Sequence, residues 1–343
     1  MKKFLNTLFV TTQGAYLNKE GESVVVSVEQ EVRLRVPMHT LGGIVCFGNV
    51  LCSPFLLGHC AQNRVGVSFL SQYGRFLARV QGPVSGNVLL RREQYRWADD
   101  PSHTLAIAQT VVTAKIANAR TTLQRALRDR PEQSGATELR AAVLRMGRML
   151  DEVKQCEDVD AVRGKEGDAG RIYFGIFDHL VTNQKEAFRF TERSRRPPLD
   201  NLNALLSFTY MLLAHDMVGA LEAVGLDPQV GFLHRDRSGR PSLALDVMEE
   251  FRPFFADRLV LSLVNLKQVQ AKGFKRTESG AVEMTDDTRK ALLVAYQKRK
   301  QEEIKHPFLD ETMPIGLLFH AQAMLLARRL RGDLDAYPPF IWK

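Results

Sequence analysis

The stretch from Gly231 to Leu261 reads GFLHRDRSGRPSLALDVMEEFRPFFADRLVL and combines one histidine with a run of carboxylates. His234 precedes a polar, glycine-containing loop, and the apolar spacing that follows predicts a helix over residues 243–264. Within that helix Asp246 and Glu249 are three residues apart, so both carboxylates lie on one helix face. The stretch therefore predicts a histidine folded back over paired carboxylates.

This set of donors suits a hard divalent cation. One imidazole nitrogen and several carboxylate oxygens favour Mn²⁺ or Mg²⁺ over the thiolate-rich sites that zinc prefers. The alternative is a surface-loop histidine beside an ordinary acidic helix face, since charged helix faces are common. These residues alone leave both interpretations open.

Two neighbouring glutamates, Glu249 and Glu250, compete for the role of ligand, and helical geometry does not choose between them. Glu249 lies about 60° to one side of Asp246 and Glu250 about 40° to the other, taking about 100° per residue. Pro253 lacks the N–H that would bond to the carbonyl of residue 249, so the helix is expected to open or kink there. A loosened turn would give Glu249 freedom to direct its side chain at a cation.

The composition is that of a globular protein with a basic surface. Of 343 residues, 45% are hydrophobic and 25% are charged, and the net charge is +8. The charge predicts a polyanionic partner without distinguishing DNA, RNA and an anionic membrane surface. The opening segment MKKFLNTLFV is predicted to be a strand rather than a signal peptide, because Asn6 interrupts its apolar run. No window approaches ~18 uninterrupted apolar residues, so no membrane span and no membrane partner are expected.

Cysteine usage points to a reducing compartment. The four cysteines form no CxxC pair, and their uneven spacing argues against a zinc knuckle and a disulfide framework. Cys46, Cys52, Cys60 and Cys156 are therefore predicted to be buried or free thiols in the cytoplasm.

The order of the patterns predicts an α+β fold, with a small N-terminal β-rich domain followed by a larger all-α catalytic domain. The predicted boundaries are 1–80 for the β-rich domain, 81–100 for a linker and 101–343 for the helical domain. Strands are predicted over 4–10, 15–17, 24–28, 32–36, 65–70 and 76–80, with a hairpin turn at 18–21 and a helix over 53–62 capped by Ser53. Helices are predicted over 102–129, 137–154, 166–182, 200–223, 243–264 with Ser242 as N-cap, 285–305 and 311–332.

The end of the predicted linker is basic and aromatic together. Residues 89–97 read LLRREQYRW, and Arg91, Arg92 and Arg96 favour contact with phosphate groups. A solvated helix end explains the same residues equally well. On the long helix that follows, Lys115, Arg120, Arg125 and Arg128 occupy polar positions.

Several common catalytic motifs are absent from the sequence. It contains no Walker-type phosphate loop, no GxGxxG, no HExxH and no GxSxG nucleophile elbow. What remains as a candidate for chemistry is the histidine and carboxylate set.

Three stretches together resemble one known family. GFLH and SLALDVMEEFRP, with Asp257 and Arg258, are similar to the signature of the CRISPR-associated adaptation integrase, the endonuclease that inserts new spacers into a CRISPR array. Residues 163–174, RGKEGDAGRIYF, resemble the glutamate motif of that family, and residues 195–213, RRPPLDNLNALLSFTYMLL, resemble the helix opening before its histidine segment. The resemblance extends over nearly the whole chain, and the N-terminal third (TLGGIVCFG, then GRFLARVQGPVSGNVLLRREQYR) is most like the type I-C form.

The resemblance implies that Glu166, His234 and Glu249 are catalytic residues and ligands of Mg²⁺ or Mn²⁺. Glu249 is favoured over Glu250 because it matches the last ligand of the family, three residues after the aspartate. Asp246 matches a further catalytic acidic position and is expected to be an outer group or an auxiliary ligand.

The sequence also gives expectations for other residues and for the position of Glu166 in its helix. Glu166 is expected in the first turn of its helix, where a capping glutamate is the alternative. Glu250 is expected outside the ligand set, either directly behind the ligands or on the surface, with Arg258 as its partner. Arg252 and Lys267 are candidates for phosphate contact.

The implied activity is phosphoryl transfer on DNA. The 3′-hydroxyl of incoming DNA attacks a phosphodiester at the repeat edge, and water in place of the hydroxyl gives nuclease activity. The implied partners are double-stranded, branched and prespacer DNA, a second copy of the chain bound through the β-rich domain, and a small ferredoxin-like CRISPR adaptation nuclease. A DNA-bridging subunit without a working site and another metal-dependent phosphoesterase are the alternatives.

Overall fold

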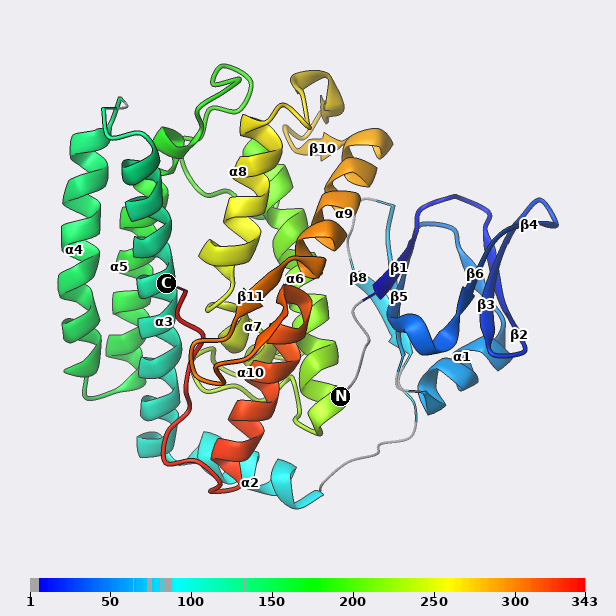
Figure 1. The fold of residues 1–343 in the computed structure, drawn as a ribbon, viewed down its shortest axis with the longest axis horizontal. Helices are drawn as coiled ribbons and strands as arrows, with labels where there is room; N and C mark the ends of the chain where they lie inside the picture. Colours follow the sequence, from blue (N-terminus) through cyan, green and yellow to red (C-terminus); the bar gives the residue numbers. More distant parts are fainter. Residues whose placement is uncertain are drawn as a thin grey trace. The chain divides into compact units, whose positions relative to one another are not determined.

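The computed structural model describes residues 6–63, 65–72, 76–80, 82, 88–132 and 134–342. The chain divides into two compact units, of which one is Met1–Gly86 with Leu293–Glu302 and the other is Asn87–Leu292 with Glu303–Lys343. The first unit is rich in strands and the second is mainly helical (Figure 1). The predicted α+β organisation is therefore confirmed.

The first sheet of the strand-rich unit has the order β1-β5-β7-β8. Its strands are β1 (Asn6–Val10), β5 (Leu41–Phe47), β7 (Gly66–Leu70) and β8 (Phe76–Val80). β1, β5 and β7 pair in parallel, and β8 pairs antiparallel with β7. No strand was predicted for β5, because glycine is unfavourable in strands and two glycines lie near its start. β5 is nevertheless a central strand that is mostly buried.

The second sheet has the order β4-β3-β2-β6 and is built on a hairpin. Its strands are β2 (Tyr16–Glu20), β3 (Ser23–Val28), β4 (Glu31–Pro37) and β6 (Leu51–Cys52). The hairpin turn was predicted at 18–21, but β2 runs on to Glu20 and the chain turns at Gly21, whose φ is 56°. A left-handed φ suits glycine, which explains the later position of the turn.

The core of this unit lies between the sheets and helix α1 (Pro54–Gln62). Ser53 Oγ accepts a hydrogen bond from Leu56 N at 3.2 Å, which confirms the predicted cap. All four cysteines are free thiols, as expected, and Cys46 and Cys60 are buried in this core. Near the end of α9 (Asp286–Gln301), in the part that belongs to this unit, Gln297 Nε2 donates to the carbonyl oxygen of Thr7 at 2.8 Å.

The helical unit begins where a linker was predicted over 81–100. Helix α2 (Val88–Asp99) occupies most of that range, while residues 81 and 83–87 lie outside the described residues. Leu90, Gln94 and Trp97 are spaced to share one face and are buried. Gln94 Nε2 donates to two carbonyl oxygens of the chain near residue 230. The glycines and proline before α2 suggested a longer linker than the chain has.

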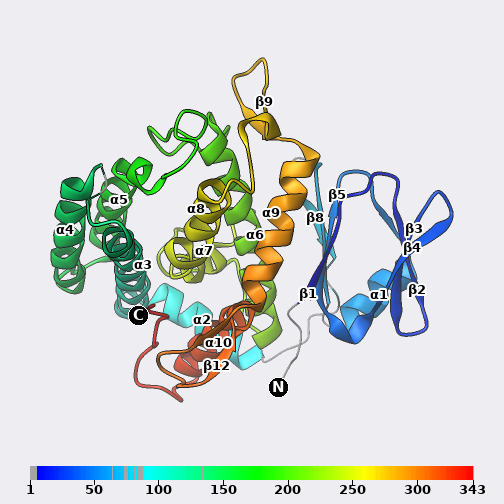
Figure 2. The ribbon, with the colours of Figure 1, turned by 45° about the horizontal axis from the view of Figure 1, so that its top comes forward.

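Three helices pack side by side at one end of this unit, as Figures 1 and 2 show: α3 (Pro101–Asp129), α4 (Ala136–Lys154) and α5 (Val159–Gly175). The prediction that this third helix spans 166–182 is wrong. Asp158 caps α5 by accepting from Ala161 N at 2.7 Å, and the helix ends before a short 3-10 turn, η2 (Phe177–Leu180). Glycines at 164, 167 and 170 each weaken helix propensity by about 1 kcal/mol and concealed the true start.

Helix α6 (Asn201–Val224) forms the centre of the unit. Asp200, the predicted first residue, is its N-cap and accepts a hydrogen bond from Asn203 N at 2.7 Å. α6 is the one described helix that is long and apolar enough to cross a membrane, yet 56% of its most apolar window is buried inside the protein. Its apolar character is that of a core helix.

The predicted helix over 243–264 is broken into three parts. α7 (Ser242–Met248) is followed by a π-helical turn, η3 (Arg252–Asp257), and by α8 (Arg258–Asn265). Pro253 lies in the π-helical turn, where the missing N–H was expected to open the helix. Ser242 is the first residue of α7 and not its cap, because its hydroxyl donates to the carbonyl oxygen of Arg235 at 3.2 Å.

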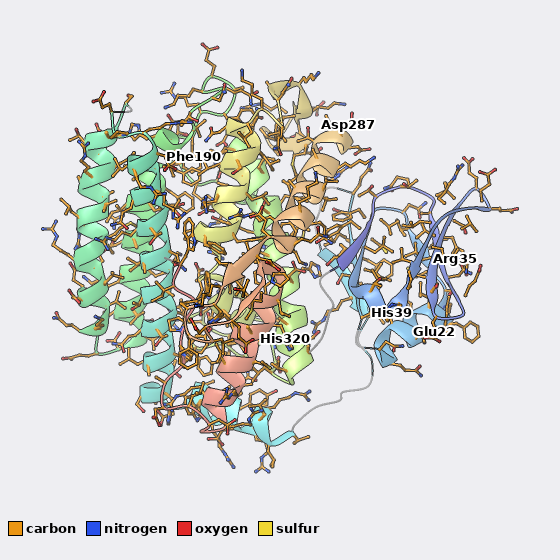
Figure 3. The ribbon with its side chains drawn as sticks, viewed as in Figure 1. Glu22, Arg35, His39, Phe190, Asp287 and His320 are labelled. Atoms are coloured by element: carbon orange, nitrogen blue, oxygen red, sulfur yellow. The ribbon has the colours of Figure 1, made fainter. Side chains whose placement is uncertain are left out.

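The rest of the unit is not wholly helical. Two short antiparallel ribbons join β9 (Phe274–Arg276) to β10 (Val282–Met284) and β11 (Glu303–Lys305) to β12 (Thr312–Pro314). α10 (Ile315–Leu330) then packs on α6. Among the side chains drawn in Figure 3, Phe190 places its ring 5.2 Å from that of Phe177 and closes the end of α5.

Candidate active site

Helix α3 lies between α5 on one side and α7 with η3 on the other (Figures 1 and 2). Three polar side chains of α3 contact the broken segment. Lys115, Asn118 and Thr122 follow one another along a single face of α3. Lys115 Nζ lies 2.8 Å from Glu249 Oε2, and Asn118 Nδ2 donates to the carbonyl oxygen of Glu250 at 2.7 Å. Thr122 Oγ1 donates to the carbonyl oxygen of Pro253 at 3.4 Å. Two carbonyl oxygens of the broken segment are thus bound by side chains of α3.

The three predicted ligand residues are brought together around Lys115. Its ammonium also forms an ion pair with Glu166, which projects from α5. His234 Nε2 lies 4.0 Å from Glu249 Oε1. Glu166 is in the body of its helix rather than in the first turn, so it is not the capping glutamate that was the alternative.

Asp246 fixes the orientation of His234. Its carboxylate accepts from the backbone N–H groups of Phe232, Leu233 and His234 at 2.6 to 2.9 Å, and His234 Nδ1 lies 2.6 Å from Oδ1. With Nδ1–H donated to this carboxylate, the lone pair of the imidazole is on Nε2, the atom that faces Glu249. Asp246 is therefore a positioning residue.

Gly231 makes this arrangement possible. A Cβ atom at this position would lie 2.7 Å from Asp246 Oδ2 and 2.8 Å from a backbone carbon of Ser242. A side chain would therefore push the histidine loop away from α7. The GFLH sequence begins with glycine because the loop must approach this close.

Glu249 is buried among positive charges. Its side chain is 1% exposed, and Arg252 NH1 lies 2.8 Å from Oε1. Burial alone would raise the pKa of Glu249, but the charges of Arg252 and Lys115 outweigh it and hold the pKa at about 2. Glu249 is thus a carboxylate at any physiological pH.

Arg252 was a candidate for phosphate contact, and the structure directs its guanidinium to Glu249 instead. The guanidinium carbon also lies 5.1 Å from the centre of the Tyr210 ring. Tyr210 OH donates to Asp257 Oδ1 at 2.5 Å, and burial raises the pKa of Asp257 to about 6. Contacts thus run from Glu249 through Arg252 and Tyr210 to the end of the π-helical turn.

Glu250 has surroundings of a different kind, and the prediction of a surface glutamate pairing with Arg258 is wrong. Its buried carboxylate accepts from Tyr337 OH at 2.6 Å, Phe340 N at 2.7 Å and Gln322 Nε2 at 2.9 Å. Burial raises the pKa of Glu250 to about 7 despite these three donors. Arg258 lies instead over the ring of Trp342, 4.3 Å from its centre.

A pocket of about 320 Å³ opens beside His234. Its lining includes Tyr95 from α2, Arg163 from α5, and His234 and Arg235 from the histidine loop. One residue of the basic and aromatic stretch over 89–97, Tyr95, therefore lines the pocket beside His234. Arg96, by contrast, pairs with Glu93 and is mostly exposed, and Arg91 Nε donates to the carbonyl oxygen of Gly225 at 3.2 Å.

Comparisons with known proteins identify the family of the chain. A family model described as CRISPR associated protein Cas1 matches residues 8–298. The chain belongs to the Cas1 family. It is 58% identical to CRISPR-associated endonuclease Cas1 1 of Chlorobaculum tepidum and 51% identical to CRISPR-associated endonuclease Cas1 2 of Rhodospirillum rubrum, and each match covers the full length of both chains.

Solved structures share the fold at lower identity. A Cas1 protein from Thermotoga maritima has a TM-score of 0.82 at 22% identity, covering 97% of this chain and 99% of its own. A casposase bound to integration product has a TM-score of 0.82 at 22% identity, covering 96% and 92%. A Cas6-RT-Cas1–Cas2 complex contains a chain with a TM-score of 0.83 at 21% identity, covering all of this chain and 36% of that one. At these identities the likeness concerns the fold.

The donor set of this Cas1-family site fits a divalent cation. Glu249 Oε2 is buried and accepts no hydrogen bond from the described residues, so its contact with Lys115 is an ion pair without hydrogen-bond alignment. Beside it are the Glu166 carboxylate and the free Nε2 of His234, a mixture that suits Mn²⁺ or Mg²⁺. In the part of the chain that the structure describes, no three His, Cys, Asp or Glu side chains already form a ligand set, because the ammonium of Lys115 separates the two glutamates.

Lys115 was not predicted as a site residue. A signal for it was present in the sequence, because its neighbours one turn away, Val111, Val112, Asn118 and Ala119, are all on the buried face of α3. A lysine on such a face requires a partner of opposite charge.

Proposed function

We propose that this protein is the metal-dependent integrase of CRISPR adaptation, joining the 3′-hydroxyl ends of spacer DNA to phosphodiesters at the edges of the repeat. The convergence of Glu166, His234 and Glu249, from three separate parts of the chain, carries this proposal. A bound Mg²⁺ or Mn²⁺ would polarise the phosphodiester and stabilise the charge on the attacking and leaving oxygens.

The residues of the chain divide the remaining tasks between them. Glu166 and His234 are 29% and 20% exposed and offer their donors toward solvent, where DNA arrives. Glu249 is fixed from behind by Arg252, and His234 by Asp246. The pocket beside His234 has room for the end of a strand; Arg163 and Arg235 on its wall both pair with Asp160, and DNA phosphate would have to compete for them.

The proposed partners are DNA, a second copy of the chain and the small ferredoxin-like adaptation nuclease. Support for DNA comes from the net charge of +8 and from the related casposase, which is described as bound to integration product. Support for the nuclease comes from the similar Cas1 chain in a Cas1–Cas2 complex. We place the protein in the cytoplasm, in keeping with its free cysteines, and assign it to the type I-C form on its N-terminal sequence.

A strand-transfer assay tests this function. An oligonucleotide with a free 3′-hydroxyl is incubated with repeat DNA, with and without Mn²⁺, and joined products are separated on a gel. The expected result is joining that requires Mn²⁺ and a free 3′-hydroxyl. DNA binding without joining would favour a bridging subunit, and hydrolysis of RNA or small phosphoesters without joining would favour another phosphoesterase.

The homodimer is proposed to form through the strand-rich unit. On the outer strand β4, Val32 and Leu34 are 56% and 44% exposed and alternate with Arg33 and Arg35. Exposed apolar side chains on an outer strand are typical of a pairing surface. Light scattering at micromolar concentration is expected to give the mass of two chains, and a monomer would contradict this proposal.

A further inference from the structure

Lys115 holds its ammonium between two carboxylates that are proposed to bind a cation. Its Nζ pairs with Glu166 and lies 2.8 Å from Glu249 Oε2, and the side chain is only 12% exposed. Asn118, one turn along α3, donates a hydrogen bond to the carbonyl oxygen of Glu250. This bond fixes the backbone next to Glu249 relative to α3. The ammonium is therefore part of the built site.

Two close carboxylates in a buried place require compensating charge. Arg252 supplies it to Glu249 Oε1, while Lys115 supplies it to Glu249 Oε2 and to Glu166. A divalent cation would use the same oxygens. An ammonium and a dication about 4 Å apart repel strongly even at an effective dielectric constant of about 20, so the two do not share these ligands.

We propose that Lys115 competes with the divalent cation for Glu166 and Glu249, so that the cation must displace its ammonium to occupy the site. This inference rests on the proposed function, because it takes the same residues as ligands. Two consequences follow from this competition. The metal-free protein keeps both carboxylates compensated, and a higher concentration of free cation is needed to fill the site.

The two basic residues of the site differ in how easily they move. Arg252 is held by Glu249 on one side and by the Tyr210 ring on the other. Lys115 pairs with Glu166 and Glu249 and has no aromatic ring over its ammonium among the described contacts, and that ammonium is carried on a flexible four-carbon stem. Lys115 is therefore the cation that yields, while Arg252 stays with Glu249.

The test compares the affinity of the full-length protein for Mn²⁺ alone, measured by electron paramagnetic resonance of free Mn²⁺. Lys115→Met, which keeps the length of the side chain and removes its charge, is expected to bind Mn²⁺ about tenfold tighter than the wild type. Its Tm in EDTA is expected to fall, and the rise of Tm on adding Mn²⁺ to exceed that of the wild type. Lys115→Arg keeps the charge and is expected to keep the weaker affinity.

Arg128→Gln is the matched control, because Arg128 is an exposed basic residue of the same helix that pairs with Asp129. It should leave Mn²⁺ affinity unchanged. Lys115→Gln serves as the second uncharged variant, and circular dichroism selects whichever is folded. A folded uncharged variant that binds Mn²⁺ no tighter than the wild type overturns the inference and leaves the proposed function standing. If neither the wild type nor any variant binds Mn²⁺, the proposed function fails with it.

Discussion

Glu249 and Glu250 are neighbours in the chain and both are buried, yet they lie in two different regions of the helical unit. Glu249 is surrounded by cationic side chains, Lys115 and Arg252, with His234 beside it. Glu250 is surrounded by neutral donors, the hydroxyl of Tyr337, the amide of Gln322 and a backbone N–H. The pKa of the first is held at about 2 and that of the second is raised to about 7.

This contrast shows how a break in a helix separates two adjacent carboxylates. α7 ends at Met248, and the π-helical turn begins at Arg252, so the two glutamates lie where the helix changes its geometry. One carboxylate turns to the site and keeps its charge. The other turns to the residues around 337–340 and gives up much of its charge. Two adjacent glutamates in a sequence can therefore have opposite pKa shifts in the folded protein.

The largest expected effect is the difference in strand-transfer activity between the alanine variants of Glu249 and Glu250. Glu249→Ala should lower Mn²⁺-dependent strand transfer by about 10³-fold or more, because it removes a ligand that no neighbour replaces. Glu250→Ala should keep strand transfer within about threefold per folded molecule. It should lower Tm by about 6 °C or more, because three buried donors lose their acceptor at about 1–3 kcal/mol each.

Initial rates of oligonucleotide joining, divided by the folded fraction from circular dichroism, decide the comparison. Asp168→Asn is the control, since Asp168 is an acidic residue of α5 two positions from Glu166 that pairs with the exposed Arg171. If Glu250→Ala loses joining and Glu249→Ala keeps it, the ligand has been assigned to the wrong member of the pair.

The next effect sharpens the difference between a ligand and a residue that positions one. Asp246→Asn replaces the carboxylate that fixes His234 and should weaken both Mn²⁺ affinity and strand transfer by about 10- to 100-fold. The loss should be smaller than in His234→Ala, which removes the donor itself. Calorimetric titration with Mn²⁺ and the joining assay measure both quantities. Equal losses in the two variants would make Asp246 a ligand in its own right.

The smallest expected effect is on how stability depends on pH. The folded pKa of Glu250 is raised from 4.5 to about 7, so the folded state binds more protons in this window and stability falls as pH rises through it. Glu249 has the opposite sign, since its pKa is lowered to about 2 and its contribution is lost as pH falls below 4.5. Glu250→Gln should therefore flatten the fall in stability between pH 5 and 8, by about 3 kcal/mol at most. Thermal unfolding in EDTA at both pH values measures this, and an unchanged slope would place the titration elsewhere.

The sequence predicted best the features that depend on local signals. Ser53 caps its helix where a cap was expected, and Pro253 lies at the break in its helix. The candidate ligands came from three motifs in a known order. Their convergence depends on packing between segments far apart in the chain, which local patterns do not encode.

The failures have physical reasons of the same kind. The start of α5 was misplaced because its glycines oppose the helix locally, while Val162, Ala169 and Tyr173 stabilise it by burial. The surroundings of Glu250 were missed because its donors come from residues 72 to 90 positions later. Lys115 was grouped with the polar residues of its helix because its partners, Glu166 and Glu249, lie on other segments.

Two contacts near the site are made by residues of the segment 337–342, which is synthesised late. Phe340 N donates to Glu250, and Trp342 N donates to Asn118 Oδ1 at 2.7 Å, on the same helix as Lys115. A ribosome releases Glu249 and Lys115 long before it releases these residues. The turn that carries Glu249 and Glu250 therefore gains these two supports only after residues 340 and 342 have been synthesised.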